Sequence, residues 1–555
     1  MTKSSGTILD GECRPEGRGT GTVPRKMTWP WVVLLLLLAA CLAHGLWIVR
    51  DLGPYTAVHD TYRDVGFVQG FLDGDLAGDP SIEGAKRYYP PLLHALAACL
   101  ALITHTPPLE LLVRAAPWAN LLVPLTFFLM ARRLISAPAA AVATTLFVCF
   151  DGLLLPPWMA ATYTPWTSVP ALTQALFFSS VWLISARIQQ GRFIDALSIG
   201  SAIGIVFLAH TVPALILAAI IAATALATQG ARLRTVAWVA VAGGVASLWA
   251  LPFIVPLVIS YHLKIVHANG AFIDDLFDPS RIPKRVIAAI LPGLFALIGL
   301  GWSFWRRKRT GVGSSRAALA ILAVWIILPV LFIARYFGCG VGGTSTVCTA
   351  FVVPVHHWMF YLQSALACVF GYAVICAWEA AGLAGRRATG AAAVAGVAFV
   401  LACALLIFRP IDQQMRDRAL DMRNRFDVPL YQWLLTHTPP SALFVADVST
   451  DGVHDTASTA VLAAGRKSVA LPFIFSNPYV NWETRRDRSE GYLAAARSGT
   501  DKQTLCRALS EAGPGNSLYI ALAAAVGHEA ENDQLQPVYR TPQNTLYSVL
   551  PSACN

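Results

Sequence analysis

The sequence predicts a multi-spanning α-helical membrane protein with about eleven transmembrane helices, followed by a C-terminal α/β domain. The 555-residue chain is 55% hydrophobic and only 13% charged, with a mean hydropathy of +0.55, whereas soluble proteins carry about 25% charged residues. Long apolar runs alternate with short basic clusters as far as Arg409, and beyond it the apolar runs become short. The change at Arg409 marks the boundary between the membrane part, 28–409, and the C-terminal domain, 410–555.

The first apolar run predicts a retained membrane span. It reads "WPWVVLLLLLAACLAHGLWIV" from Trp29 to Val49, which is long enough to cross a hydrocarbon core of ~30 Å. The run is too long for a cleaved signal peptide, and no small-residue cleavage site precedes Arg50 and Asp51. The segment before it, 1–27, is basic and rich in Gly and Ser, which predicts a disordered cytoplasmic tail.

Basic residues predict the orientation of the membrane part. The chain has 42 Lys and Arg residues and 32 Asp and Glu residues. Between Pro410 and Asn555 lie 13 of the basic and 15 of the acidic residues, so the basic excess belongs to the membrane part. This pattern favours positive-inside loops over nucleic-acid binding. The basic clusters placed inside are Arg132–Arg133, Arg187–Arg192, Arg232–Arg234, Arg306–Arg309 and Arg386–Arg387. The predicted spans are 28–50, 113–133, 136–155, 167–187, 192–210, 213–229, 235–259, 285–304, 316–335, 357–380 and 390–409, with the N-terminus inside and the C-terminus outside.

One apolar segment is excluded from the spans because of its length. "PPLLHALAACLALI" (90–103) has 14 residues, and segments of 10 to 14 are more often interfacial or buried than spanning. Counting it as a span would also place Arg132–Arg133 on the outer side, against the positive-inside pattern. We therefore predict a helix at the outer membrane surface, inside a large first outer loop that covers 51–112.

The C-terminal domain shows strand and hairpin patterns. "ALFVADVS" and "NSLYIALA" predict short buried strands, and "TASTAVLAAGRKSVAL" predicts a helix that leads to a strand. "QPVYRTPQNTLYSVL" predicts a hairpin across a polar turn. No repeat of 20–50 residues and no similarity between halves is visible, although transporters often show one.

The predicted outer loops contain the acids, bases and histidines that could form one site at the membrane interface. Ionisable groups at membrane depth are costly and are often functional. Each also has a structural interpretation: most of 64–83 reads as a solvated loop, Asp151 could end its helix, Arg335 could extend to the membrane surface, and His210 reads as an interface residue. The candidates are the carboxylates of Asp60 and Asp151 and the side chains of Lys86, Arg87, Lys264, Arg335, His356 and His357, and Arg335 together with His356 and His357 would suit an anion.

The order of motifs in the membrane part resembles the GT-C superfamily of membrane glycosyltransferases. Asp60 follows the first span closely, "YYPPL" (88–92) begins the surface helix, and Arg114 and Pro117 enter a span that ends in "ARRL". The pattern is similar to the protein O-mannosyltransferases and the aminoarabinose transferases of lipid A, and more distantly to oligosaccharyltransferases. The likeness covers Trp29 to Arg409, and its motifs match at the level of the superfamily.

The resemblance implies an inverting transferase that moves a sugar from a polyprenyl-phosphate donor at the periplasmic face of a bacterial inner membrane. Asp60 matches the loop acid that serves as catalytic base or metal ligand, and Asp151 falls where some members have a second acid. The resemblance also implies cations at the leaving phosphate, for which the candidates are Arg335, His356 and His357, with Lys264, Lys86 and Arg87 in reserve. The lysine of the "KPPL" motif is absent because "YYPP" stands there, and "WWDYG" is absent too. The implied partners are the lipid-linked sugar, membrane lipids and a glycan, lipid or protein acceptor, with no nucleic acid. No cofactor is certain, and a divalent metal is one option.

Two other functions fit the composition. A transporter or flippase would place a central path at the membrane midplane, and a non-catalytic scaffold would act through 410–555. The outer location also predicts disulfides, because they persist in oxidising compartments. Cys339 and Cys348 bracket a glycine-rich segment and form the main candidate pair, and Cys506 and Cys554 form a second.

Overall fold

In the computed structural model the chain divides into two compact units, which are described separately. The helical unit comprises Met1–Ile48, Ala116–Leu251 and Gly270–Met415, and the mixed unit comprises Val49–Ala115, Pro252–Asn269 and Arg416–Asn555. The structure describes residues 29–53, 59–154, 169–266, 316–339, 355–380, 420, 426–448, 456–499, 501–513, 517–523 and 533–554. The predicted spans 285–304 and 390–409 lie outside the described residues.

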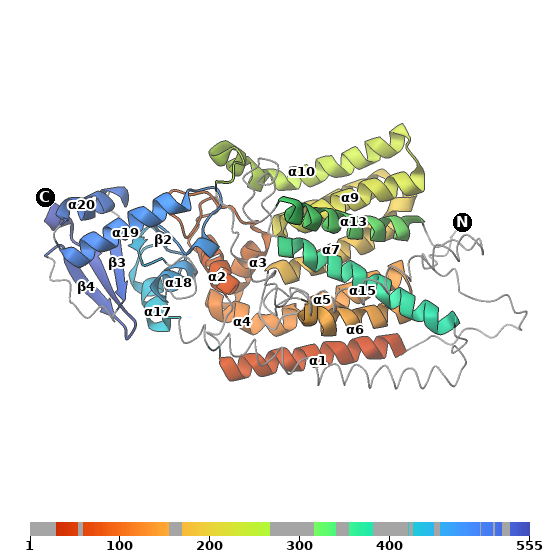
Figure 1. The fold of residues 1–555 in the computed structure, drawn as a ribbon, viewed down its shortest axis with the longest axis horizontal. Coiled ribbons are helices and arrows are strands. Elements are labelled where there is room, and N and C mark those ends of the chain that lie inside the picture. Colours follow the sequence, from red (N-terminus) through yellow and green to blue (C-terminus); the bar gives the residue numbers. More distant parts are fainter. Residues whose placement is uncertain are drawn as a thin grey trace, which may run out of the picture. The chain divides into compact units, whose positions relative to one another are not determined.

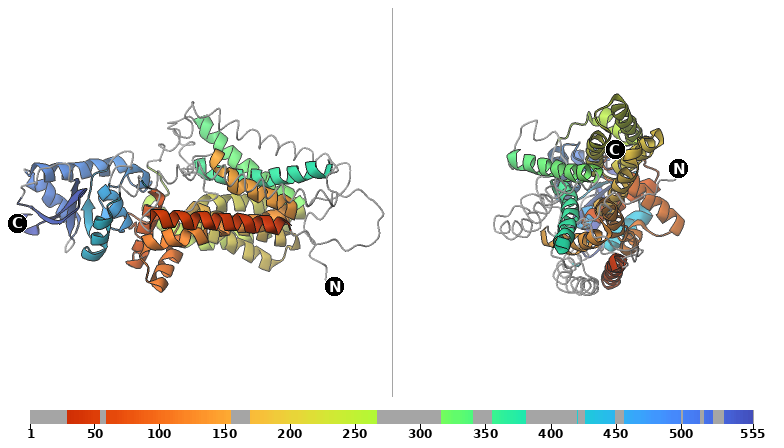
Figure 2. Two further views of the ribbon diagram at one scale, coloured as in Figure 1. Left: turned by 90° about the horizontal axis from the view of Figure 1, so that it is seen from below. Right: turned by 90° about the vertical axis from the view of Figure 1, so that its right-hand side faces the viewer.

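The helical unit is a bundle of long apolar helices (Figures 1 and 2). Its elements are α1 (Trp29–Leu52), α5 (Leu122–Leu134), α6 (Ala137–Leu154), α7 (Val169–Arg187), α8 (Phe193–Ala209), α9 (Thr211–Gln229), α10 (Leu233–Tyr261), α13 (Arg316–Cys339) and α15 (Val355–Ala380). Helix α6 packs against α5 and α15, and α13 packs against α9 and α15. A Cβ at Gly371 of α15 would lie 2.4 Å from the Ala139 carbonyl oxygen, so this close helix contact requires glycine.

Aromatic rings fill the centre of the helical unit. The rings of Phe127 and Phe147 stack at 4.2 Å between centroids, and Phe177 meets the edge of Trp325 at 4.9 Å. All four side chains are buried. Aromatic pairs of this kind contribute stability beyond the burial of their area. The first pair joins α5 to α6, and the second joins α7 to α13.

Among the described residues, seven helices are long and apolar enough to cross a membrane, so the chain is a membrane protein. They are Trp29–Arg50, Pro108–Leu134, Val169–Gln190, Thr211–Gln229, Leu233–Tyr261, Arg316–Arg335 and His357–Cys376. The predicted spans at 136–155 and 192–210 coincide with the shorter apolar helices α6 and α8. The predicted surface helix is α3 (Leu92–Thr104), whose 13 residues extend only about 20 Å at ~1.5 Å per residue.

The mixed unit is built on a five-stranded sheet. Its order is β2-β1-β3-β5-β4, with parallel pairing of β1 to β2 and β3, and antiparallel pairing of β5 to β3 and β4. The strands are β1 (Leu443–Val445), β2 (Lys467–Ser468), β3 (Leu518–Ala523), β4 (Leu535–Arg540) and β5 (Asn544–Val549). The predicted strands, the helix before β2 and the C-terminal hairpin are therefore confirmed.

Helices from two distant parts of the sequence complete the mixed unit. They are α2 (His59–Leu72), α3, α4 (Pro108–Ala119), α17 (Val428–His437), α18 (Thr456–Ala463), α19 (Trp482–Ser498) and α20 (Lys502–Glu511). Helix α2 packs against α3 and α18. At Gly66 of α2 a Cβ would come 2.1 Å from the Leu462 carbonyl oxygen, so α2 and α18 can pack this closely only with glycine. The predicted Cys506–Cys554 disulfide is present and joins α20 to the C-terminus.

The acids of the first loop correct one prediction. Most of 64–83 was expected to be solvated, but Asp64 is 3% and Asp79 1% exposed. The Asp73 carboxylate pairs with Arg466 at 2.9 Å and the Asp75 carboxylate with Lys467 at 2.6 Å. These contacts fix the loop to the C-terminal sheet region. Charges with partners nearly 400 positions away read as a solvated loop from the sequence alone.

Candidate active site

Helix α2 begins at His59 and places Asp60 in its first turn. The Asp60 side chain is 52% exposed, and its Oδ1 accepts a hydrogen bond from Arg63 Nη1 at 3.2 Å. Residues three apart share one face of a helix, and a carboxylate is favourable near a helix N-terminus. The result is an oriented, solvent-accessible carboxylate at the start of a buried helix.

Arg63 lies between two carboxylates. Its Nε and Nη2 donate to Asp64 Oδ1 at 3.2 and 3.0 Å, and its guanidinium lies over the Tyr89 ring at 4.5 Å. Burial alone would lower the pKa of Arg63, but Asp60 and Asp64 outweigh burial and raise the pKa well above its ordinary value. The guanidinium is therefore a permanent charge held in one geometry, and it orients Asp60.

The buried Asp64 side chain holds the Asp60–Arg63 pair in place through a second contact, with His94. Its Oδ1 also lies 3.1 Å from His94 Nε2, and His94 Nδ1 lies 3.3 Å from the Pro90 carbonyl oxygen. Burial would raise the pKa of Asp64, but Arg63 and the hydrogen bond to His94 lower it below its ordinary value. The buried chain Arg63–Asp64–His94 thus joins α2 to α3.

The "YYPP" segment packs two tyrosine rings, those of Tyr88 and Tyr89, into this cluster. Burial raises the pKa values of Tyr88 and Tyr89, so both phenols stay neutral. The Tyr89 ring meets the His94 ring at 5.6 Å between centroids, and the Phe67 ring contacts both Tyr88 and Tyr89. Where the "KPPL" pattern has a lysine, this chain has Tyr89, whose ring lies under the Arg63 guanidinium.

The two predicted cations of the first loop differ in exposure. The Lys86 side chain is exposed, while its backbone N–H donates to Tyr261 Oη at 2.6 Å. Arg87 is 4% exposed, its guanidinium lies 3.9 Å above the Phe71 ring, and Nη2 donates to the Asp75 carbonyl oxygen at 2.7 Å. Burial lowers the pKa of Arg87 to about 10. Lys86 therefore faces solvent, and Arg87 is part of the core.

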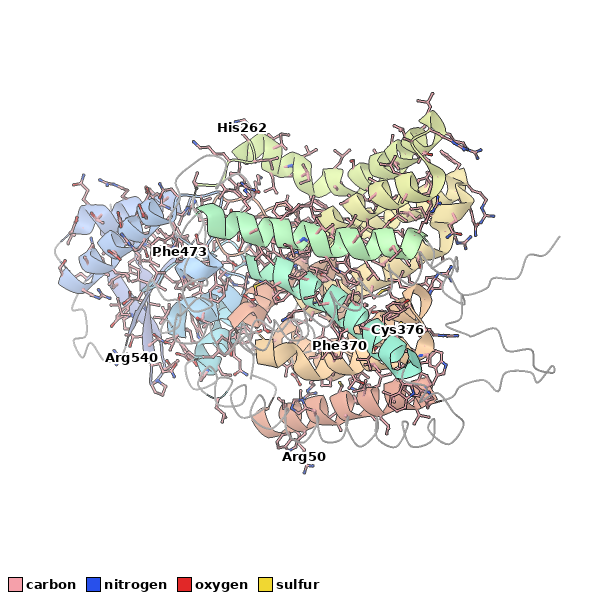
Figure 3. The ribbon with its side chains drawn as sticks, turned by 45° about the vertical axis from the view of Figure 1, so that its right-hand side comes forward. Arg50, His262, Phe370, Cys376, Phe473 and Arg540 are labelled. Atoms are coloured by element: carbon pink, nitrogen blue, oxygen red, sulfur yellow. A yellow bond between two sulfur atoms is a disulfide. The ribbon has the colours of Figure 1, made fainter. Side chains whose placement is uncertain are left out.

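The last turns of α10, from Pro252 to Tyr261, and the loop after it belong to the mixed unit. Tyr261 stacks on Tyr479 at 5.1 Å between centroids, and Val266 N–H donates to the Pro478 carbonyl oxygen at 3.0 Å. His262 lies just past the end of α10 (Figure 3), and the Lys264 side chain is exposed. Two predicted outer loops, those holding Lys86 and Lys264, are thus brought together through Tyr261.

The remaining predicted residues lie in the helical unit. Arg335 is half-buried in α13, and His357 Nδ1 lies 2.7 Å from His210 Nε2. His210 caps α9, where its Nδ1 accepts from Val212 N–H at 3.4 Å. Asp151 and His356 belong to α6 and α15, but their side chains lie outside the described residues. The Cys339 side chain and Cys348 also lie outside them, so that disulfide stays a prediction.

Sequence reasoning missed the partners of Asp60 and His357. The spacing of Asp60, Arg63 and Asp64 at i, i+3 and i+4 was the available signal for a shared helix face. For His210 it was the position just before the helix-starting "TVP", which is a cap position. Among the residues that the structure describes, no group of three or more His, Cys, Asp or Glu side chains has the arrangement of a metal site.

Comparison with known proteins shows the fold of the chain. No family model and no curated protein matches the sequence. The apo oligosaccharyltransferase of Archaeoglobus fulgidus matches with a TM-score of 0.54 at 14% identity, over 90% of this chain and 70% of that one. ArnT from Cupriavidus metallidurans bound to undecaprenyl phosphate matches with a TM-score of 0.50 at 12% identity, over 96% and 100%. The chain therefore has a GT-C-like fold, as the motifs predicted.

A third similar structure contains a different lipid phosphate. The archaeal oligosaccharyltransferase AglB from Archaeoglobus fulgidus, in complex with an inhibitory peptide and a dolichol-phosphate, has a TM-score of 0.51 at 14% identity, over 90% of this chain and 70% of that one. Two of these similar structures thus contain a polyprenyl-type phosphate.

Proposed function

We propose that this chain is an inverting glycosyltransferase that moves a sugar from a polyprenyl-phosphate donor to an acceptor at the periplasmic face of a bacterial inner membrane. The observation that carries the proposal is the exposed Asp60 carboxylate, oriented by Arg63 and anchored by buried Asp64 and His94. The GT-C-like fold and the lipid phosphates in the similar structures support this substrate class. The proposed topology has eleven spans and a periplasmic C-terminal domain.

Asp60 acts as the general base in this reaction. Its carboxylate takes the proton of the acceptor hydroxyl as the acceptor oxygen attacks the anomeric carbon of the sugar. The bond from that carbon to the phosphate oxygen breaks, and the polyprenyl phosphate leaves with the electron pair. Attack opposite the leaving group inverts the configuration. Arg63 orients the base and is not assigned to the leaving phosphate, because the carboxylates of Asp60 and Asp64 already neutralise its charge.

The charge on the leaving phosphate requires cations. Lys86 and Lys264 are exposed in the mixed unit and are proposed for this role. In the helical unit Arg335, His356 and His357 stay candidates for the donor phosphate, and Asp151 stays the candidate second acid. A divalent metal would supply the same charge, and removal of metal by a chelator tests that route.

The test is sugar transfer by the purified, full-length protein in lipid vesicles, with lipid-linked sugars extracted from its native membranes as donors. Asp60→Asn should lower the rate by roughly 10²–10⁴-fold, the usual cost of a lost general base. Asp487→Asn is the matched control, because Asp487 is an exposed acid on α19 with a 64% exposed side chain. Transfer by Asp60→Asn at the wild-type rate would remove Asp60 from the mechanism.

A further inference from the structure

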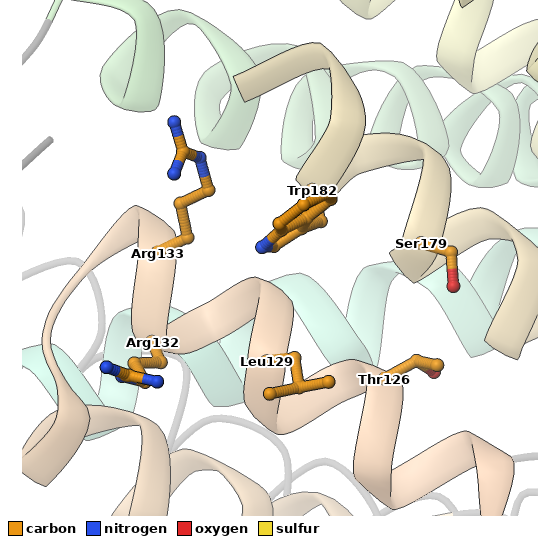
Figure 4. Close-up of a pocket in the computed structure, with 6 residues that line it drawn as sticks. All are labelled: Thr126, Leu129, Arg132, Arg133, Ser179 and Trp182. Carbon is orange, nitrogen blue, oxygen red and sulfur yellow. The ribbon is translucent and has the colours of Figure 1, made fainter. Parts of the chain in front are cut away.

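A groove between α5 and α7 of the helical unit has a basic end and an apolar end. Its volume is about 570 Å³, within the ~300–1,000 Å³ of typical ligand pockets. Figure 4 shows Arg132 and Arg133 at one end, Thr126 and Ser179 at the other, and Leu129 and Trp182 between them. None of these six residues belongs to the proposed catalytic cluster.

Neither Arg132 nor Arg133 has an acidic partner among the residues that the structure describes. Arg132 lies over the Trp31 ring at 5.0 Å and Arg133 over the Trp182 ring at 5.8 Å, which are neutral contacts. In the described part of the chain, no carboxylate lies within ion-pair distance of either guanidinium, and Arg133 Nε is buried with no hydrogen-bond partner. By contrast, Arg187 and Arg192 of the same unit both pair with Asp195, at 3.7 and 3.1 Å. Within the described part of the chain, the two positive charges at the basic end of the groove are therefore not compensated by a carboxylate.

At the other end of the groove, the polar side chains already have hydrogen-bond partners within the protein. The Thr126 hydroxyl donates to the Leu122 carbonyl oxygen at 2.7 Å, and the Ser179 hydroxyl donates to the Ala175 carbonyl oxygen at 2.8 Å. Both hydroxyls are thus satisfied within their own helices. With Leu129 and the 44% exposed Trp182, they leave a surface suited to a hydrocarbon chain.

We propose that this groove binds one anionic phospholipid of the bilayer, with its phosphate at Arg132 and Arg133 and an acyl chain along Leu129 and Ser179. Charge complementarity at one end and apolar character at the other select an anion with a hydrocarbon tail. Basic pockets between transmembrane helices bind anionic headgroups in this way. Arg132 and Arg133 then have a ligand as well as a role in setting the topology.

The experiment is native mass spectrometry of the detergent-solubilised full-length protein, titrated with phosphatidylglycerol or with phosphatidylcholine. We expect one phosphatidylglycerol to bind preferentially. Arg132→Gln with Arg133→Gln should weaken it by roughly tenfold to thirtyfold, since each basic residue near the headgroups contributes about fivefold. Arg232→Gln with Arg234→Gln removes the same charge from exposed positions at the start of α10 and should leave the affinity unchanged.

A second variant distinguishes binding in the groove from attraction of the lipid by surface charge. Ser179→Trp keeps both arginines but fills the apolar end, so it should also lose phosphatidylglycerol. Equal losses in the two arginine pairs, or full binding by Ser179→Trp, would overturn the proposal. Displacement of phosphatidylglycerol by soluble glycerol phosphate would assign the site to a free phosphate, and preferential displacement by undecaprenyl phosphate would assign it to the donor lipid. Either result would overturn the proposal too.

Discussion

His94 Nε2 lies 3.1 Å from Asp64 Oδ1, and the two side chains are 2% and 5% exposed. The same carboxylate oxygen accepts from Arg63 Nη2 at 3.0 Å, so one buried acid connects the helix that carries Asp60 with the helix that carries His94. A buried charge is stable when its partners are in place and costly when one is removed. Asp64 is therefore expected to support both the fold of the mixed unit and the geometry of Asp60.

Asp64→Asn should lower the free energy of unfolding by about 3 kcal/mol, the usual scale for breaking a buried ion pair. In this variant the side-chain amide at position 64 is neutral, and Asp60 is the carboxylate that still pairs with the Arg63 guanidinium. Asp487→Asn, which breaks an exposed pair with Arg486, should cost about 1 kcal/mol or less. Thermal unfolding in detergent measures both, and equal melting temperatures for the two variants would contradict the prediction.

The same residue predicts a pH dependence. The folded-state pKa of Asp64 is lowered, so its contribution to stability is present above the unfolded pKa of about 3.9. That contribution is lost as the pH falls through the lower folded pKa. The difference in melting temperature between wild type and Asp64→Asn should therefore be full at neutral pH and shrink below about pH 4. A difference that stays constant down to pH 2 would show that Asp64 is not ionised in the folded protein.

Arg63→Lys tests the orienting role of the guanidinium. The planar fork of Arg63 contacts Asp60 and Asp64 together, whereas an ammonium group is a single compact charge. We expect kcat for sugar transfer to fall by about tenfold or more, with little change in KM, because substrate binding does not involve Arg63 and the base is misplaced. A variant with wild-type kcat, or one whose loss is entirely in KM, would exclude an orienting role.

The fold followed from local patterns, whereas several contacts of the first loop and of the histidines depended on residues far away in the sequence. The short length of α3 and the hairpin of β4 and β5 were readable because each depends on neighbouring residues. The Asp73–Arg466 ion pair joins residues 393 positions apart and the His210–His357 contact joins residues 147 apart. A single sequence carries no signal for such pairs, so Asp73 read as solvated and the contact between His210 and His357 was not predicted. Asp60 was singled out by its position after the first span and by the resemblance, and its partners were found in the structure.

The Cys506–Cys554 disulfide should stabilise the C-terminal part of the mixed unit. It closes a loop with a sequence separation of 48, for which the chain-entropy relation gives about 4 kcal/mol. Cys506→Ser should lower the melting temperature accordingly, and a reducing agent should have the same effect on wild type. Cys99→Ser is the matched control because Cys99 is free and exposed. Alkylation of Cys506 in unreduced, unfolded wild-type protein would show that the bond does not form.

The last prediction concerns the side of the membrane on which α3 ends. Because α3 has 13 residues and is too short to cross the ~30 Å hydrocarbon core, Thr106 should lie on the same outer side as the rest of the first loop. In a Cys99→Ser background, Thr106→Cys should react with a membrane-impermeant thiol reagent on intact spheroplasts, above the labelling of the parent. Gln189→Cys, at an exposed position in the predicted inner cluster 187–192, should react only after permeabilisation. If Thr106→Cys is protected until permeabilisation and Gln189→Cys is labelled without it, α3 crosses the membrane and the positions of Arg132 and Arg133 are inverted.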